Sequence, residues 1–320
     1  MRCPKERRRS RFPATLAAAA AAVIFATDGA GNDTRPARAQ TPAAAETPKA
    51  PAPAPPARLP SLTGTFRTHA NFPSRFLAKG RDVLVYLPPG YDAPGNRARR
   101  YPVLYLHDGQ NVFDGATSFL PNREWRVDET AQALIEEKAI EPLLIVAVYN
   151  AGADRNDEYT PTRGERFGGK ADAYGRMLVE ELKPFIDRTY RTRKDAANTG
   201  LGGSSFGGLV SLYLGLKYPD VFGKLAVVSP SVWWDSRFPL RQVAALAAHP
   251  PLRIWMDMGT GEGERSVADA RALRDALVAK GWTPGKDLSY LEAPGAEHNE
   301  DAWARRVEPM LRFLFPEARR

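Results

Sequence analysis

Short apolar runs alternate with segments of helical spacing through most of the chain, and this alternation constrains the fold more than any other feature. The runs are rich in β-branched and aromatic residues and apolar at nearly every position, as strands buried on both faces require. Strands that alternate with helices predict a mainly parallel sheet with helices on both faces, the α/β class. Proline and glycine at 87–102 favour an antiparallel start to the sheet. The apolar runs are 82–88, 102–107, 143–150, 225–230, 253–258 and 288–293, and the helical segments are 127–138, 174–190, 207–218, 266–280 and 301–315.

The first 61 residues lie outside this pattern. Residues 1–39 join a strongly basic start to an uncharged, alanine-dominated run, which is the layout of an export signal. Cleavage fits after Ala39 and also near Ala26, and a twin-arginine signal and an uncleaved anchor remain alternatives. Residues 40–61 are rich in proline and alanine and predict a disordered linker. We therefore expect an exported protein, periplasmic or secreted, with its folded domain at 62–320 and no stable membrane span after the signal is removed.

The formal net charge of +8 is concentrated near the N-terminus. Residues 1–39 hold eight Lys and Arg against three acidic residues, a net +5, so the rest of the chain carries +3 (8 − 5). This near balance gives little reason to expect a nucleic-acid partner. The single cysteine, Cys3, lies inside the predicted signal, so we expect neither an intramolecular disulfide nor a thiol for catalysis or metal binding in the exported protein.

A glycine-rich stretch, GGSSFGG, lies between an apolar run and a helical segment. Its register fits G-x-S-x-G only with Ser205 at the centre, because centring on Ser204 would need glycine where Phe206 stands. In a parallel sheet, a serine on such a strand-to-helix turn is held in strained geometry and is open to substrate. The alternative is a turn that only lets the helix pack closely on the sheet.

A serine nucleophile needs a base, and the chain has four histidines. His298 follows the last apolar run and precedes the last helical segment, which is the position of the base where the chain order is serine, acid, histidine. His249 precedes a proline and indicates a solvated loop, whereas His69 has no chemistry nearby. His107 ends an apolar run and suits a role in shaping a site.

The acid that orients the base is expected after the run at 253–258. Glu262, in the glycine-rich loop, is the first candidate, and Asp257, inside the run, is the second; the spacing does not decide between them. An oxyanion needs two backbone N–H donors. The residue after the nucleophile, Phe206, supplies one, and Gln110, in HDGQNVFD, is the candidate for the other. An ordinary Asp-Gly turn would also explain that second stretch.

Six motifs together carry a resemblance: YLPPGYD, LYLHDGQNVFD, AVYNAGADRNDEYTP, GGSSFGG, MDMGTGEGE and GAEHNEDAWARR. In this order they resemble the putative esterase family of α/β-hydrolases, the enterochelin-esterase-like, feruloyl esterase and esterase D group, over roughly residues 62–314. The resemblance implies an α/β-hydrolase fold, Ser205 as nucleophile, His298 as base, an acid in the loop of Glu262, and Gln110 and Phe206 as oxyanion donors. It implies a serine esterase that needs no cofactor and no metal.

Substrate contacts are expected from side chains that follow strands. Trp125, Trp233 and Trp234 could line an acyl or aromatic pocket, although buried packing explains each equally well. Arg155 could hold a polar substrate or form an ion pair within its loop, and Asn111 adjoins the oxyanion stretch. The expected substrate is a small-molecule or carbohydrate ester, such as an aromatic ester or a siderophore-type lactone. An acyltransferase on the same scaffold and a non-catalytic binding module are the alternatives, and the oligomeric state stays open.

Overall fold

The computed structural model describes residues 57–317. The predicted export signal and most of the predicted linker lie outside these residues. The last linker residues do not: Arg58 Nη1 donates to the carbonyl of Ala116 at 3.0 Å, and Ser61 Oγ donates to Glu124 at 3.0 Å. The packed domain therefore begins before residue 62. Within 57–317, no helix has the length and apolar character to cross a membrane.

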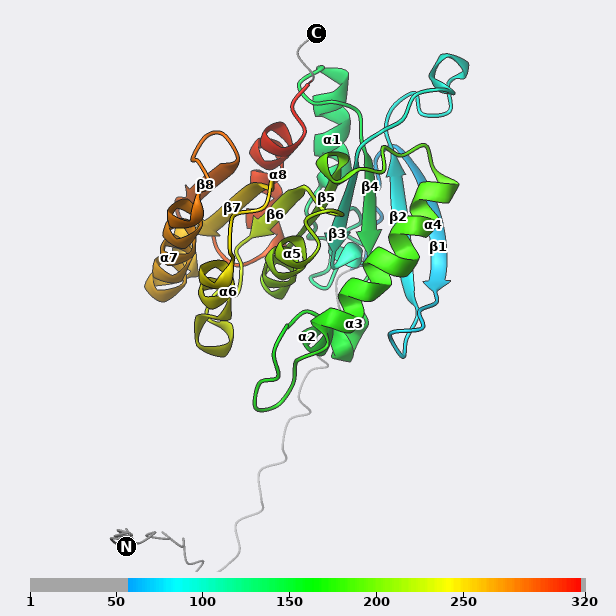
Figure 1. Cartoon of the computed structure of the whole chain (residues 1–320). Coiled ribbons are helices and arrows are strands. Elements are labelled where there is room, and N and C mark those ends of the chain that lie inside the picture. Colours follow the sequence, from blue (N-terminus) through cyan, green and yellow to red (C-terminus); the bar gives the residue numbers. More distant parts are fainter. Residues whose placement is uncertain (1–56, 318–320) are drawn as a thin grey trace, which may run out of the picture. The chain divides into compact units, whose positions relative to one another are not determined.

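Eight strands form one sheet in the order β1-β2-β4-β3-β5-β6-β7-β8 (Figure 1). The first three in this order pair antiparallel, and every later pair is parallel, so the antiparallel start predicted from residues 87–102 is confirmed. The strands are β1 (Thr65–Phe72), β2 (Arg81–Leu87), β3 (Val103–His107), β4 (Leu144–Val148), β5 (Thr199–Ser204), β6 (Lys224–Val228), β7 (Arg253–Gly259) and β8 (Leu288–Ala293). The prediction of a mostly parallel sheet with helices is confirmed.

Helices cover both faces of this sheet. The helices α1 and α8 pack on one face, and α3 to α7 pack on the other (Figure 1). The predicted helix at 174–190 is one helical path, in which a π-helical segment, Met177–Leu182, joins α3 to α4. The helices are α1 (Val127–Glu136), α2 (Arg155–Glu158), α3 (Ala171–Arg176), α4 (Lys183–Thr189), α5 (Phe206–Lys217), α6 (Trp234–Ala245), α7 (Glu264–Lys280) and α8 (Glu300–Leu314).

Alternate residues of the central strands enter two separate cores. In β3, Val103 and Tyr105 join the core under α3 to α7, whereas Leu104 and Leu106 join the core under α1 and α8. All four side chains are almost completely buried. Two buried faces explain why this strand is apolar at every position before its last residue, His107. The buried sheet is thus a rigid base for the loops at the carboxyl ends of its strands, where a site is expected.

Candidate active site

Ser205 occupies a sharp turn between β5 and α5. Its backbone has φ 60° and ψ −122°, a region that side-chain-bearing residues rarely adopt, and its N–H donates to the carbonyl of Val228 at 3.1 Å. The turn is close-packed: a Cβ on Gly208 would lie 2.8 Å from the same Val228 oxygen. A side chain at position 208, in the first turn of α5, would therefore collide with the backbone at the end of β6. The geometry matches the strained strand-to-helix turn that G-x-S-x-G predicts.

His298 and Glu262 contact each other directly. His298 lies between β8 and α8, Glu262 lies in the turn after β7, and Nδ1 of the imidazole is 2.6 Å from Oε2 of the carboxylate. The imidazole is half exposed, with a side-chain exposure of 45%, whereas the carboxylate is only 2% exposed. When Nδ1–H donates to the carboxylate, Nε2 of the neutral ring is an acceptor. This pair can therefore take a proton from a nucleophile.

Glu262 is held as an anion by several donors. Its Oε1 accepts from Ser229 Oγ at 2.6 Å and from the N–H of Gly259 at 2.9 Å. Burial alone raises the pKa of Glu262, but the hydrogen bonds from His298 and Ser229, the charge of His298 and the Gly259 N–H outweigh burial and leave the pKa below its ordinary value. Glu262 is therefore a carboxylate at neutral pH.

Asp257, the second candidate acid, is occupied elsewhere. It is completely buried in β7, with Oδ1 2.8 Å from Arg306 Nη1 and Oδ2 accepting from Trp255 Nε1 at 2.7 Å. Burial raises the pKa of Asp257 to about 6, although Arg306 acts in the opposite direction. The structure thus brings Glu262, and not Asp257, to the imidazole.

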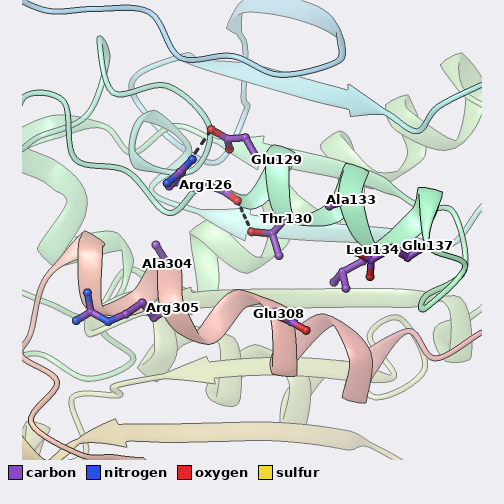
Figure 2. A pocket seen from close by; sticks show the side chains of 9 residues that line it. All are labelled: Arg126, Glu129, Thr130, Ala133, Leu134, Glu137, Ala304, Arg305 and Glu308. Carbon is purple, nitrogen blue, oxygen red and sulfur yellow. Dashed lines mark hydrogen bonds and ion pairs between the residues drawn. The ribbon is translucent and has the colours of Figure 1, made fainter.

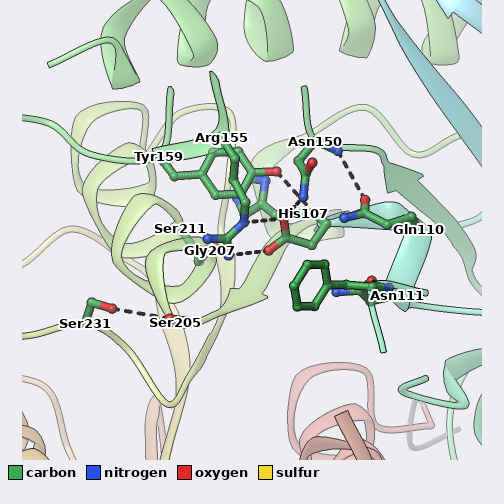
Figure 3. A network of polar contacts seen from close by, with 12 residues as sticks. His107, Gln110, Asn111, Asn150, Arg155, Tyr159, Ser205, Gly207, Ser211 and Ser231 are labelled. Atoms are coloured by element: carbon green, nitrogen blue, oxygen red, sulfur yellow. Dashed lines mark hydrogen bonds and ion pairs between the residues drawn. The ribbon is translucent and has the colours of Figure 1, made fainter. Parts of the chain in front are cut away.

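Ser205 and His298 line the same cleft, which has a volume of about 470 Å³. The hydrogen-bond partner of the Ser205 hydroxyl is Ser231 Oγ at 3.5 Å, and not the imidazole (Figure 3). Contacts between a nucleophile and its base are often long without substrate and tighten when substrate binds. The lining residues are Asp108, Gln110, Asn111, Phe119, Asn150, Gly152, Arg155, Asn156, Ser204, Ser205, His298, Glu300 and Trp303.

The two predicted oxyanion donors are both at the start of a helical turn. Phe206 is the first residue of α5, and Gln110 is in the short 3₁₀ helix Gly109–Asn111 that follows β3. N–H groups in a first helical turn have no partner within the helix, and the helix dipole makes them suitable for an anion. Gly109 allows this turn to approach β4, because a Cβ there would lie 2.7 Å from the carbonyl carbon of Ala147.

A family model described as "Putative esterase" matches residues 74–314. The chain belongs to this esterase family. It is 24% identical over 256 residues to the uncharacterized protein YbbA of Bacillus subtilis, covering 76% of this chain and 95% of YbbA. It is 27% identical to an endo-1,4-beta-xylanase/feruloyl esterase of Xylanibacter ruminicola, covering 76% of this chain and 30% of that protein. The crystal structure of the enterobactin esterase FES of Shigella flexneri in the presence of enterobactin aligns with a TM-score of 0.63 at 20% identity, covering 80% of this chain and 60% of FES. This likeness confirms the α/β-hydrolase fold.

Arg155 and Asn111 both reach the cleft of this esterase-family protein, but neither side chain is free. Arg155 donates twice to Asp108, with both distances 2.6 Å, and Asn150 donates to the same carboxylate at 2.7 Å (Figure 3). Burial disfavours the charge on Arg155, but its attraction to Asp108 outweighs burial and raises the pKa of Arg155 above its ordinary value. Asn111 donates to Glu300 at 3.2 Å. Arg155 therefore forms an ion pair with Asp108, outside its own loop, while it lines the cleft, and its contact with a substrate stays a prediction.

The three predicted tryptophans do not line the cleft. Trp125 is buried against Trp303, with ring centroids 5.7 Å apart. Trp234 is also buried, and its Nε1 donates to Thr162 at 2.8 Å. Trp233 is 48% exposed but lines a different hollow, with Arg265, Ser266 and Asp269. The prediction of substrate contacts is corrected for Trp125 and Trp234, because large aromatic surface after a strand is buried in the core more readily than in an open cleft.

Two aromatic residues that the sequence analysis did not single out, Phe119 and Trp303, line the cleft in place of the predicted tryptophans. Phe119 is 77% exposed at the cleft, and Asn111 Oδ1 accepts from its N–H at 2.9 Å. Trp303 lies one turn into α8, and its ring packs edge-on against His298 at 5.0 Å. The sequence could have indicated that Trp303 lies near the site, because it follows His298 within the motif GAEHNEDAW. Phe119 lies in a loop with no comparable signal.

The other histidines lie outside the reacting pair. His107 is buried with Nδ1 2.8 Å from the hydroxyl of Tyr174, and burial lowers its pKa to about 3, so it is neutral. His69 contacts the hydroxyl of Tyr190 at 2.7 Å. His249 is exposed beside Trp282, as its position before a proline indicates.

Among residues 57–317, one group of acidic side chains has the spacing of metal ligands. Glu124, Asp128 and Glu129 each place an oxygen within 4.8 Å of the others. None of the three lines the cleft of Ser205. A groove of about 380 Å³ between α1 and α8 is also separate from the cleft, since the two share no lining residue (Figure 2). The described residues that line this groove include neither a serine nor a histidine.

Proposed function

We propose that the protein is an exported serine carboxylic-ester hydrolase that works through an acyl-enzyme. The observation that carries this proposal is the 2.6 Å contact between His298 and Glu262 in a chain whose Ser205 lies in the same cleft. A hydroxyl becomes an effective nucleophile only when a base removes its proton, and the base must be oriented by a third group. Membership of the esterase family supports the reaction class.

In the proposed first step, Nε2 of His298 takes the proton of Ser205, and Oγ attacks the ester carbonyl. The N–H groups of Phe206 and Gln110 stabilise the oxyanion, and Glu262 stabilises the imidazolium. Collapse of the intermediate breaks the ester C–O bond, and His298 returns the proton to the leaving alcohol. Water, deprotonated by His298, then attacks the acyl carbonyl; the bond to Ser205 Oγ breaks, His298 returns the proton to Oγ, and the acid is released. No cofactor takes part in these steps.

We propose esters with an aromatic acyl group as the substrate class, including feruloyl esters and siderophore-type lactones. Two aromatic side chains, Phe119 and Trp303, line the cleft together with the polar groups of Asn150, Arg155 and Asn156. Such a lining suits a flat ring that carries hydroxyl groups. The names of the matched feruloyl esterase and enterobactin esterase agree with this class. The basic and alanine-rich residues 1–39 support export.

The proposal is tested with the chain from residue 57 on a panel of p-nitrophenyl and methyl feruloyl esters. Ser205→Ala and His298→Ala are each expected to lower kcat/KM by about a thousandfold or more. Ser236→Ala is the matched control, because Ser236 is an exposed serine on α6 that does not line the cleft. Full activity in Ser205→Ala would refute the serine mechanism. Transfer to an added alcohol that outcompetes hydrolysis would indicate an acyltransferase, and specific binding without turnover would indicate a binding module.

A further inference from the structure

A buried polar network lies behind Glu262 and has no part in the reaction steps above. Ser229 Oγ donates to Glu262 Oε1 at 2.6 Å and accepts from Trp303 Nε1 and Arg306 Nη2, both at 3.1 Å. Arg306 also forms an ion pair with Asp257, with Nη1 2.8 Å from Oδ1. The side chains of Arg306 and Asp257 are 4% and 0% exposed. Burying an ion pair costs desolvation that apolar side chains avoid, so stability alone is a weak reason for it.

The network converges on Glu262 from three parts of the fold. Ser229 follows β6 and has φ 39°, a conformation uncommon for a residue with a side chain. Its N–H donates to Asp257 Oδ1 at 3.2 Å, so the backbone and side chain of one residue contact both carboxylates. Arg306, on α8, likewise lies between the two, with Nη2 3.8 Å from Glu262 Oε1. Ser229 and Arg306 thus each lie between the two carboxylates.

We propose that Ser229 and Arg306 are positioning residues that hold the Glu262 carboxylate against His298, and that Asp257 sets how much of the Arg306 charge acts on that carboxylate. This inference rests on the proposed function, in which Glu262 orients the base.

The charges of the network predict in which direction each substitution changes the stability of the His298 imidazolium. With both carboxylates ionised, Asp257, Glu262 and Arg306 carry a net charge of −1, which stabilises the imidazolium of His298. Loss of the Asp257 charge leaves a net charge of zero and destabilises the imidazolium. Burial raises the pKa of Asp257 to about 6, so this change occurs in the range where imidazoles titrate.

The remaining charged groups near His298 are unchanged by substitutions in the network. Glu300, at the start of α8, interacts with the charge of His298 and also with Asp108. Asp108 is itself paired with Arg155 at 2.6 Å. None of these three residues is changed in the variants below, so each variant and the wild type share the same surroundings outside the network.

The test is the titration of the His298 ring, followed by NMR of the folded protein, with the ring assigned through His298→Asn. In Asp257→Asn we expect the midpoint to fall by about half a pH unit, and in Arg306→Met to rise by a similar amount. The double variant Asp257→Asn/Arg306→Met removes both charges and should titrate near wild type. It also keeps the test valid where Arg306→Met alone fails to fold. Asp269→Asn is the matched control, because Asp269 is also buried and paired with an arginine, Arg237, but is not part of the network.

The same shifts should move the acid limb of the pH profile of kcat/KM. Ser229→Ala should lower kcat/KM about tenfold or more, because a charge-assisted hydrogen bond to Glu262 is lost. Midpoints within about 0.2 pH unit of wild type in both single charge variants would overturn the proposal. That outcome is distinct from failure of the proposed function, because the NMR titration needs no substrate, whereas failure of the function appears as Ser205-independent activity or none.

Discussion

Replacing Glu262 with glutamine isolates the contribution of its charge to catalysis. Two unit charges about 4 Å apart interact by about 4 kcal/mol at an effective dielectric of about 20 and by about 1 kcal/mol in water. The carboxylate is buried but the imidazole is half exposed, so an intermediate value of about 2–3 kcal/mol applies. This corresponds to a fall in kcat/KM of about 30- to 150-fold.

The amide geometry adds to this loss. Ser229 Oγ and the Gly259 N–H both donate to Oε1 of Glu262, so a glutamine would keep its carbonyl there and turn its NH₂ toward Nδ1 of His298. The ring would then carry its proton on Nε2, which could not accept the proton of Ser205. We therefore expect a total loss of about a hundredfold or more.

The assay is kcat/KM on the best ester of the panel, with the melting temperature measured in parallel. Glu264→Gln is the control: Glu264 lies two residues further along the chain and is exposed, so this substitution should leave kcat/KM unchanged. A fall of less than about threefold in Glu262→Gln, with unchanged melting temperature, would refute the role of Glu262 as the acid.

Three further predictions concern stability and specificity. Glu158→Gln leaves the buried guanidinium of Arg81 without its charge partner at 2.9 Å and should destabilise the fold by about 3 kcal/mol or more, seen as a lower urea midpoint; an unchanged midpoint would contradict this. Burial, with a hydrogen bond to Glu129, raises the pKa of Asp128 to about 9. The folded state therefore keeps a proton on Asp128 that the unfolded state releases above about pH 4, so the free energy of unfolding falls as the pH rises toward 9. The melting temperature of Asp128→Asn relative to wild type should therefore increase between about pH 5 and about pH 8.5, and a constant difference would be inconsistent with this. Phe119→Ala should raise KM for feruloyl esters about three- to tenfold and leave acetyl esters unchanged, and equal effects on both would argue against an aromatic subsite.

The parts of the fold that sequence could predict are those with two buried faces. β4 is apolar at every position, and β3 at every position except the last, His107, because the side chains enter one of two cores. β1 gives no such signal, since its residues are exposed or half-buried along an edge of the sheet. The helix α6 was not predicted, because it contains Pro239 and three consecutive non-helical residues, Asp235 to Arg237.

Some residues of the candidate site could be predicted from the sequence, and others could not. Ser205 and His298 could be placed from the sequence because each lies between a strand and the helix that follows it in the alternating pattern. The contact of Glu262 with His298 could not, because Asp257 and Glu262 are five residues apart and only the turn after β7 determines which one faces the imidazole. The roles of Ser229 and Arg306 could not be predicted, although Arg306 ends the motif GAEHNEDAWARR, since each contacts partners far away in sequence.

The hydrogen bonds of residues 57–61 bear on how far the chain can be shortened. These residues form hydrogen bonds with the segment that carries Phe119. Arg58 donates to the carbonyls of Ala116 and Ser118, and Ser61 donates to Asp114 through its N–H and to Glu124 through its hydroxyl. A fragment begun at Leu62, where the proline-rich composition ends, would retain every residue that lines the cleft but lose these hydrogen bonds. The Phe119 loop would then keep its hydrogen bond to Asn111 but lose those to residues 57–61, so we expect a chain begun at residue 62 to hold this wall of the cleft less firmly than one begun at residue 57.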